Sequence, residues 1–127
     1  MEEYLKQVEQ IFNHVCIILK VKDFKLRIMQ RRGPVNNLNG YTLAYTKLEE
    51  KVIVMDILTP KRRQPRSVNS ILRLLAHEIA HHQKPPYRQR YRGRWIIRQH
   101  YPQFYKQVNK NVDKLKKHKL FRQYFQT

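Results

Sequence analysis

Cysteine and glycine are scarce in this 127-residue chain, which has one cysteine, Cys16, and three glycines. A single thiol excludes a disulfide framework and fits a reducing compartment. It also excludes an accessory zinc ribbon built from paired cysteines. Cys16 lies in an apolar helical run, so we expect it to pack in the core, and a thiol that caps a metal is the alternative.

Uninterrupted apolar segments are also missing. The apolar stretch 11–21 contains Asn13, His14 and Lys20, so we do not expect it to span a membrane. The chain begins with Met-Glu-Glu, the opposite of the basic start of a signal peptide. We therefore expect an intracellular protein, in the cytoplasm and nucleoid or in the nucleus, that is neither secreted nor inserted in a membrane.

Acidic residues nearly vanish from the second half of the chain. Residues 1–60 hold nine Lys/Arg and seven Asp/Glu, a net +2, whereas residues 61–127 hold eighteen and two, a net +16. Such a density of one sign favours a polyanionic partner, with nucleic acid expected before an anionic membrane. We expect sequence-independent phosphate contacts from Lys61, Arg62, Arg63, Arg66, Arg88, Arg90, Arg92, Arg94 and Arg98.

Aromatic residues are interleaved with these arginines. Tyr87, Tyr91 and Trp95 are spaced by four, as a stripe on a helix would be. Aromatic rings beside arginine can stack on single-stranded bases. The alternative is that Trp95, with Ile96 and Ile97, packs on the core, and we favour this interpretation for Trp95 while leaving the tyrosines open.

A metal-binding motif lies between the two basic groups, at His77-Glu78-Ile79-Ala80-His81. In an HExxH segment two histidines four residues apart project from one face of a helix, with a carboxylate beside them. The preceding residues 67–76 have helical apolar periodicity that continues through the motif. The sequence therefore predicts a zinc site on a helix, one ion per chain, with Glu78 as the adjacent base.

A catalytic zinc needs a third protein ligand. No glutamate follows Glu78, and the histidines downstream are His82, His100 and His118. His82 projects about 100° away from His81 around the helix. We favour His100, which precedes a proline-initiated amphipathic helix, over the interpretation that it is an ordinary surface histidine.

These residues resemble the SprT-like, or Spartan-like, zinc metalloproteases. The resemblance rests on the HExxH segment and on His100-Tyr101-Pro102-Gln103-Phe104-Tyr105, with Tyr101 in the place of the family's glycine, and it spans roughly residues 1 to 115. It implies that His100 is the third zinc ligand, that Phe104 packs beneath it, and that Glu78 is the general base that activates a zinc-bound water. It further implies an intracellular endopeptidase that degrades proteins bound or crosslinked to DNA.

The expected fold is α+β and zincin-like, in one domain over residues 1–127 with a strongly basic C-terminal half. Apolar patterning predicts an N-terminal helix over 2–20 and a three-stranded sheet. The strands are expected at 24–29, 41–47 and 51–57, the last two forming a hairpin that could bind extended substrate. A turn-rich loop is expected at 33–40, and the HExxH helix is followed by C-terminal helices. The last twelve residues are expected to dock as a helix, with a mobile arm as the alternative.

The sequence is compatible with three functions. The first is a DNA-dependent zinc endopeptidase that acts on DNA-bound proteins. The second is a nucleic-acid-binding module whose zinc is structural and closed by a fourth ligand such as His82 or Asp113. The third is a small metallopeptidase that does not depend on DNA. The oxyanion-stabilising group is not fixed by the sequence, where Tyr87, Tyr91, Tyr101 and Tyr105 are candidates by chemistry alone.

Overall fold

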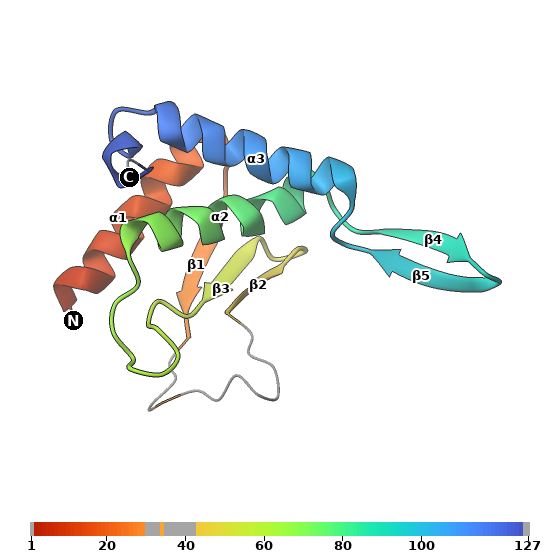
Figure 1. The fold of residues 1–127 in the computed structure, drawn as a ribbon, viewed down its shortest axis with the longest axis horizontal. Helices are drawn as coiled ribbons and strands as arrows, with labels where there is room; N and C mark the ends of the chain where they lie inside the picture. The colour runs from red at the N-terminus through yellow and green to blue at the C-terminus, as the bar shows by residue number, and fades with distance from the viewer. Residues whose placement is uncertain (1, 30–33, 35–42, 126–127) are drawn as a thin grey trace.

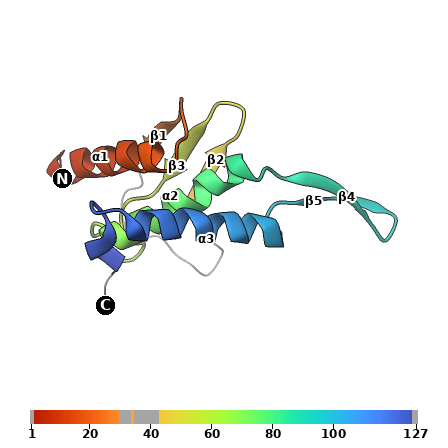
Figure 2. The ribbon, with the colours of Figure 1, turned by 90° about the horizontal axis from the view of Figure 1, so that it is seen from above.

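The computed structural model describes residues 2–29, 34 and 43–125 and shows a mixed α+β fold. A helical body rests on a small sheet, and a two-stranded ribbon projects from the body (Figures 1 and 2). The elements are α1 (Glu2–Ile18), β1 (Lys25–Ile28), β2 (Ala44–Lys47), β3 (Val52–Met55), α2 (Val68–Gln83), β4 (Tyr87–Tyr91), β5 (Arg94–Arg98), α3 (Pro102–Lys117) and a 3-10 helix η1 (Arg122–Phe125).

The first helix forms as predicted but ends at Ile18 instead of residue 20. Lys20 has a φ of 58°, in the left-handed region, and the Val21 N–H turns back to the Cys16 carbonyl, which closes the helix. The buried face of α1 carries Val8, Ile11, Phe12 and Val15. Cys16 is half-buried against this core, as expected, and burial raises the pKa of its thiol to about 11.

The sheet has the order β1-β3-β2, with β3 in the centre. β2 and β3 pair antiparallel as the predicted hairpin, and β1 pairs parallel with β3. Ile53, Val54 and Met55 are all buried, so both faces of this central strand are covered. β2 therefore lies at an edge of the sheet, and its outer side pairs with no other described strand.

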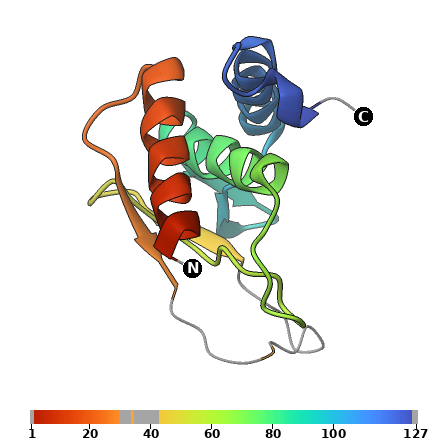
Figure 3. The ribbon, with the colours of Figure 1, turned by 90° about the vertical axis from the view of Figure 1, so that its left-hand side faces the viewer.

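The helix that carries the HExxH segment lies at the centre of the molecule. Figure 3 shows α2 between α1 and α3, with the sheet beneath. The helix begins after Ser67, whose hydroxyl accepts a hydrogen bond from the Ser70 N–H, and ends before Pro85. Ile71, Leu72 and Leu75 are completely buried, so a single core joins α1, the sheet, α2 and α3.

The segment between the motif and His100 differs from the helix stripe that the sequence suggested. β4 and β5 form an antiparallel ribbon joined by a tight turn at Arg92 and Gly93, whose φ values are 50° and 77°. Pro85 and Pro86 prevent continuation of α2. The prediction that Trp95 packs on the core with Ile96 and Ile97 is wrong. Trp95 and Ile97 are 58% and 66% exposed, and Ile96 does not belong to the core.

The C-terminal residues dock on the body. Phe121 is buried in the core and Phe125 packs against it, whereas Leu120 stays exposed. The docking element is the short 3-10 helix η1, following a turn, and not a continued α-helix. The expected loop 33–40, apart from Pro34, and residues 41 and 42 of the expected strand lie outside the described residues. Among those described, no helix combines the length and apolarity that crossing a membrane requires.

Candidate metal centre

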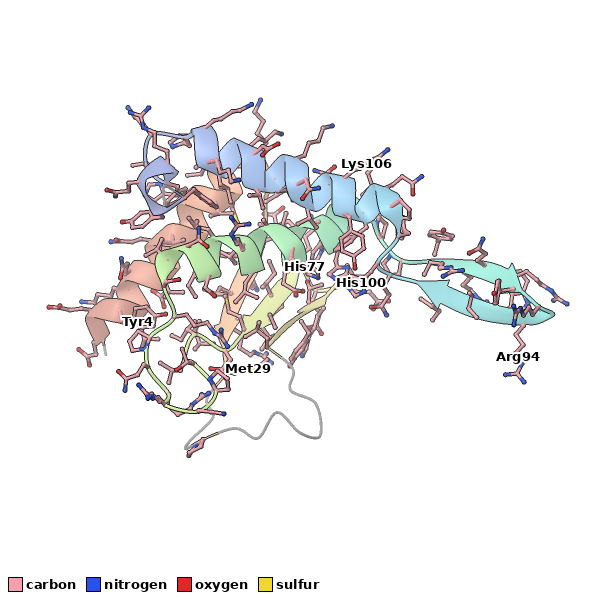
Figure 4. All side chains as sticks on the ribbon, viewed as in Figure 1. Tyr4, Met29, His77, Arg94, His100 and Lys106 are labelled. Carbon is pink, nitrogen blue, oxygen red and sulfur yellow. The ribbon has the colours of Figure 1, made fainter. Side chains whose placement is uncertain are left out.

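Three histidines from two separate parts of the chain meet beside α2. His77 and His81 lie one turn apart on α2, and His100 lies between β5 and α3. Their ligand nitrogens are all within 4.8 Å of one another. Figure 4 shows His77 and His100 near each other where the ribbon joins the body. Three imidazoles in this arrangement could hold a divalent transition metal such as zinc, which takes three protein ligands in catalytic sites.

Phe104 supports this histidine cluster from below. Its side chain is completely buried, its ring stacks on that of His81 at 4.4 Å between centroids, and its edge contacts with His77 and His100 are 5.0 and 5.2 Å. Phe104 lies in the first turn of α3 and His100 lies just before that helix, so the same end of α3 positions both side chains. The packing that the family resemblance implied for Phe104 is present.

Tyr101, in the position where the resemblance expects glycine, closes the base of the ribbon. Its backbone has φ −105° and ψ 167°, an extended conformation that any L-residue adopts, so glycine is not required here. The Tyr101 hydroxyl donates to the Pro85 carbonyl at 2.9 Å, and its ring contacts Tyr87 at 4.9 Å. The two ends of the ribbon are thereby joined next to His100.

The environment keeps two of these imidazoles neutral. Burial lowers the pKa of His77 and lowers the pKa of His81 to about 4, and repulsion from the neighbouring histidines adds to both shifts. A neutral imidazole offers the lone pair that a metal ligand requires. The cluster is therefore ready to bind a cation without first releasing protons from these two rings.

Glu78 lies on the floor of a cleft next to the histidines. Its side chain is 5% exposed, and burial raises the pKa of its carboxyl to about 7. The central cleft, about 340 Å³, is bounded by His77, Glu78, His81 and His100 on one side and by β2 on the other. A second hollow, the side pocket of about 580 Å³, shares His77 and Glu78 with it. Glu78 thus borders both spaces.

The edge strand β2 forms the wall opposite the histidines. Ala44, Tyr45 and Thr46 all line the central cleft, and because consecutive residues of a strand face opposite ways, the strand's edge borders the cleft. Thr46 is hydrogen-bonded to His82 Nε2, which ties β2 to α2. His82, whose ring also contacts Phe24 at 4.5 Å, faces the sheet and not the histidine cluster.

A buried asparagine that the sequence did not single out fastens α3 to α2. Asn111 is completely buried, and its Nδ2 donates to the Ala76 carbonyl at 3.1 Å and to Gln83 Oε1 at 2.7 Å. Its Oδ1 accepts from Gln107 at 3.0 Å. Position 111 falls in the apolar stripe of α3, and a polar residue in that stripe is the signal that could have revealed it.

We expect Asn111→Ala to destabilise the protein by about 1–3 kcal/mol, because it leaves the Ala76 carbonyl and the Gln83 amide without their buried partner. The shift in the midpoint of urea unfolding measures this effect. Asn109→Ala, the same change at an exposed position of α3, should leave the midpoint unchanged. Equal midpoints for the two variants would show that the Asn111 contacts add no net stability.

The basic residues expected to bind phosphate lie at opposite ends of α2. Lys61, Arg62, Arg63 and Arg66 belong to the loop before the helix, and the five arginines of the 88–98 segment belong to the ribbon after it (Figure 1). None of the nine lines the central cleft or the side pocket.

Two of the loop residues have structural partners. Arg63 Nη1 and Nη2 donate to the buried carboxylate of Asp56 at 2.8 and 3.1 Å, and the Arg63 side chain is 11% exposed. Arg66 Nε donates to the Asp56 carbonyl at 2.9 Å. Arg63 thus neutralises Asp56 inside the fold, which leaves Lys61 and Arg62 as the exposed basic side chains of this loop.

The ribbon arginines are all exposed, and four of the five lie over aromatic rings. Arg98 also donates to Gln89 Oε1 at 2.8 Å. Arg88 and Arg90 lie over the Trp95 ring at 5.1 and 5.5 Å. Arg92 and Arg98 lie over the Tyr91 ring at 5.2 and 5.8 Å. Figure 4 places Arg94 at the far end of the ribbon, well away from His100. The ribbon therefore exposes an arginine-rich surface with aromatic rings, and Ile96 is its one half-buried residue.

No protein-family model matches the chain, and no curated protein is similar enough in sequence to count as a relative. The fold is similar to that in the crystal structure of the metallopeptidase zymogen of Pyrococcus abyssi abylysin. The TM-score is 0.50 at 19% sequence identity, and the match covers 85% of this chain and 88% of that one. The chain therefore has a metallopeptidase-like α+β fold with three histidines that could hold a metal.

Proposed function

We propose that this protein is a SprT-like, zincin-like zinc endopeptidase that acts on proteins bound or crosslinked to DNA. The observation that carries the peptidase assignment is the convergence of His77, His81 and His100 beside the buried Glu78, in a cleft walled by an edge strand. The likeness of the fold to a metallopeptidase supports the same class of reaction.

In this proposal the three histidines hold one zinc ion. When bound, zinc supplies a Lewis acid that polarises the scissile carbonyl and makes water a better nucleophile. The carboxylate of Glu78 accepts the proton of the attacking water and delivers it to the leaving amine. Because Glu78 borders both the central cleft and the side pocket, it can reach the scissile bond of a chain that crosses from one to the other.

The substrate chain lies along β2 in this arrangement. An extended peptide can add to an exposed sheet edge through main-chain hydrogen bonds, which bind without demanding particular side chains. Such pairing suits an enzyme whose substrates are selected by location. Tyr45, 42% exposed and bordering the central cleft, is available to contact the added strand.

The alternative with a structural zinc is disfavoured by the positions of its proposed fourth ligands. His82 faces Thr46 and Phe24. Asp113 is exposed on α3 and does not belong to the histidine group. Within the described residues the group has three members, which leaves a coordination position for water and substrate.

The DNA part of the proposal rests on the ribbon. Its five arginines have no acidic residue among them. Trp95, the only tryptophan of the chain, is exposed, and Arg88 and Arg90 lie over its ring. Arginines of this kind neutralise phosphates, and an exposed ring beside them stacks on an unpaired base for about 1–3 kcal/mol. The ribbon joins the body beside His100, so DNA held there would bring bound proteins to the cleft.

We expect the triple variant Arg88→Gln, Arg90→Gln, Arg94→Gln to lose DNA-stimulated cleavage of a DNA-crosslinked protein while still cleaving free peptides. Binding of single-stranded and duplex oligonucleotides, followed by Trp95 fluorescence, should weaken. For duplex DNA the slope of log affinity against log salt should fall in magnitude by about 2 to 3, close to 0.9 per lost phosphate contact.

The matched control replaces Lys106, Lys110 and Lys114 on the exposed side of α3 by glutamine, which removes the same charge. An equal loss in this control would show that net charge, and not the ribbon, recruits DNA. Peptide cleavage that DNA never stimulates, even at low salt, would favour the DNA-independent peptidase.

A further inference from the structure

The side pocket lies on one particular side of the scissile bond. It shares Ala44, His77 and Glu78 with the central cleft, so the reacting atoms lie where the two spaces meet. Along β2 the central cleft extends toward Thr46 and Leu48, whereas the side pocket extends toward Leu43. The two spaces thus receive substrate residues from opposite sides of the bond that is cut.

The direction in which the substrate chain binds decides which space receives the residues before the scissile bond and which receives those after it. Antiparallel pairs are more stable per residue than parallel ones and are two- to threefold more common, so a strand added to β2 is expected to run against it. The substrate then passes Leu48 first and Leu43 last. Residues before the scissile bond occupy the central cleft, and the residue after it enters the side pocket.

The described lining of the side pocket has one positive group. Leu43, Ala44 and Leu74 provide apolar walls, and among the described lining residues Arg73 is the only charged one apart from Glu78 beside the histidines. Arg73 precedes His77 by one turn of α2, so it projects from the same side of the helix.

The orientation of Arg73 is set by its neighbours. Its Nε donates to Asn69 Oδ1 at 3.0 Å, and its guanidinium lies over the Phe125 ring at 5.3 Å. Asn69 is itself held, because its Nδ2 donates to the Tyr124 carbonyl at 2.8 Å. The docked C-terminal turn therefore orients the guanidinium of Arg73, which belongs to the lining of the pocket.

We propose that the side pocket selects an acidic side chain immediately after the scissile bond, through Arg73. The inference rests on the proposed peptidase function and adds a specificity-determining residue to it. The aliphatic stem of a glutamate fits between Leu43 and Leu74, and its carboxylate meets the guanidinium, a pair that arginine forms in a bidentate geometry.

The test reads the new N-terminal residues that cleavage creates in a mixed peptide pool, by mass spectrometry. With the parent protein, glutamate should exceed glutamine at that position by up to about fivefold, the range of a partly exposed ion pair. Arg73→Gln should remove the preference, and Arg73→Glu should replace it by a preference for lysine. Lys110→Glu makes a comparable charge change outside both spaces and should keep the glutamate preference.

An unchanged distribution of N-terminal residues in Arg73→Glu would overturn the inference while leaving the peptidase assignment in place. Should no peptide be cleaved, the peptidase assignment fails, and binding decides the inference separately. Labelled peptides that carry glutamate or lysine are then titrated into the Glu78→Gln variant and into the double variant that also carries Arg73→Glu. If each variant binds the glutamate peptide and the lysine peptide with equal affinity, the inference is overturned.

Discussion

Glu78→Gln should abolish proteolysis, with a loss of about 10²–10⁴-fold in the cleavage rate, while zinc content and DNA binding stay unchanged. Glutamine has nearly the shape of glutamate and fits the same buried position, but its amide cannot accept the proton of the attacking water. The candidate metal group consists of three histidines and does not include Glu78, so the variant should still bind the ion. Cleavage of a labelled peptide at saturating zinc measures the loss.

Glu3→Gln is the matched control, since it makes the same chemical change at an exposed position of α1. It should leave the rate unaltered. Elemental analysis of both variants verifies that zinc is retained, and oligonucleotide binding verifies that the ribbon is intact. Cleavage by Glu78→Gln at the rate of the parent protein would refute the role given to this carboxylate.

His100→Ala should lower zinc affinity by at least about 100-fold, because loss of an outer-sphere partner alone costs 10- to 100-fold and His100 is a direct ligand in the proposal. Zinc per chain, measured by elemental analysis after dialysis, should fall from one to nearly zero. His100 is exposed, so its truncation leaves no cavity in the core, and the circular dichroism spectrum should stay that of the parent.

The control is His118→Ala, at the end of α3, where the ring accepts a hydrogen bond from the Leu120 N–H at 3.2 Å. This histidine is remote in sequence from the cluster and should not change the zinc content. Full zinc in His100→Ala would reassign the third ligand. Zinc missing from the parent chain as well would remove the metal centre and leave a basic nucleic-acid-binding domain as the best interpretation.

The parts of the fold with strong periodicity could be predicted from the sequence. The apolar faces of α1 and α2 repeat with the period of a helix, and Val52–Met55 is apolar on both faces because β3 is covered on both. The i, i+4 spacing placed His77 and His81 on one face without any knowledge of the fold. His100 came from elimination of other downstream histidines, and the structure brings it within reach of both.

The ribbon could not be predicted from residue spacing alone. Tyr87, Tyr91 and Trp95 repeat every four residues, which satisfies a helix, but in the ribbon Tyr87 and Tyr91 share one face and Trp95 lies on the other. Trp95 was expected to pack on the core with Ile96 and Ile97, but a large apolar ring serves equally well at an exposed binding surface. Pro85-Pro86 before the segment and Arg92-Gly93 in its middle were the local signals of a hairpin.

Contacts between distant residues account for the remaining differences between the predicted and the observed roles of residues. Arg63 looks like any other member of a basic loop, and its ion pair with the buried Asp56 seven residues away gives it a structural role. Two of the three hydrogen-bond partners of Asn111, Ala76 and Gln83, lie on another helix, so the sequence around Asn111 does not indicate them. Such pairings depend on tertiary geometry, which a one-dimensional pattern does not encode.

The hydrogen bond from Tyr101 to the Pro85 carbonyl marks the junction between the ribbon and the body. The sequences of these two parts can change at different rates during evolution. Residues 87–98 support no core side chain, so substitutions there carry little cost in stability, whereas the residues around Phe104 and Asn111 tolerate few. In the proposed endopeptidase, the partner of the ribbon can therefore be altered by changing a dozen surface residues without changing the residues that carry the reaction. A designer could exchange the hairpin between its two fixed ends and redirect the same cleft to a different class of macromolecule.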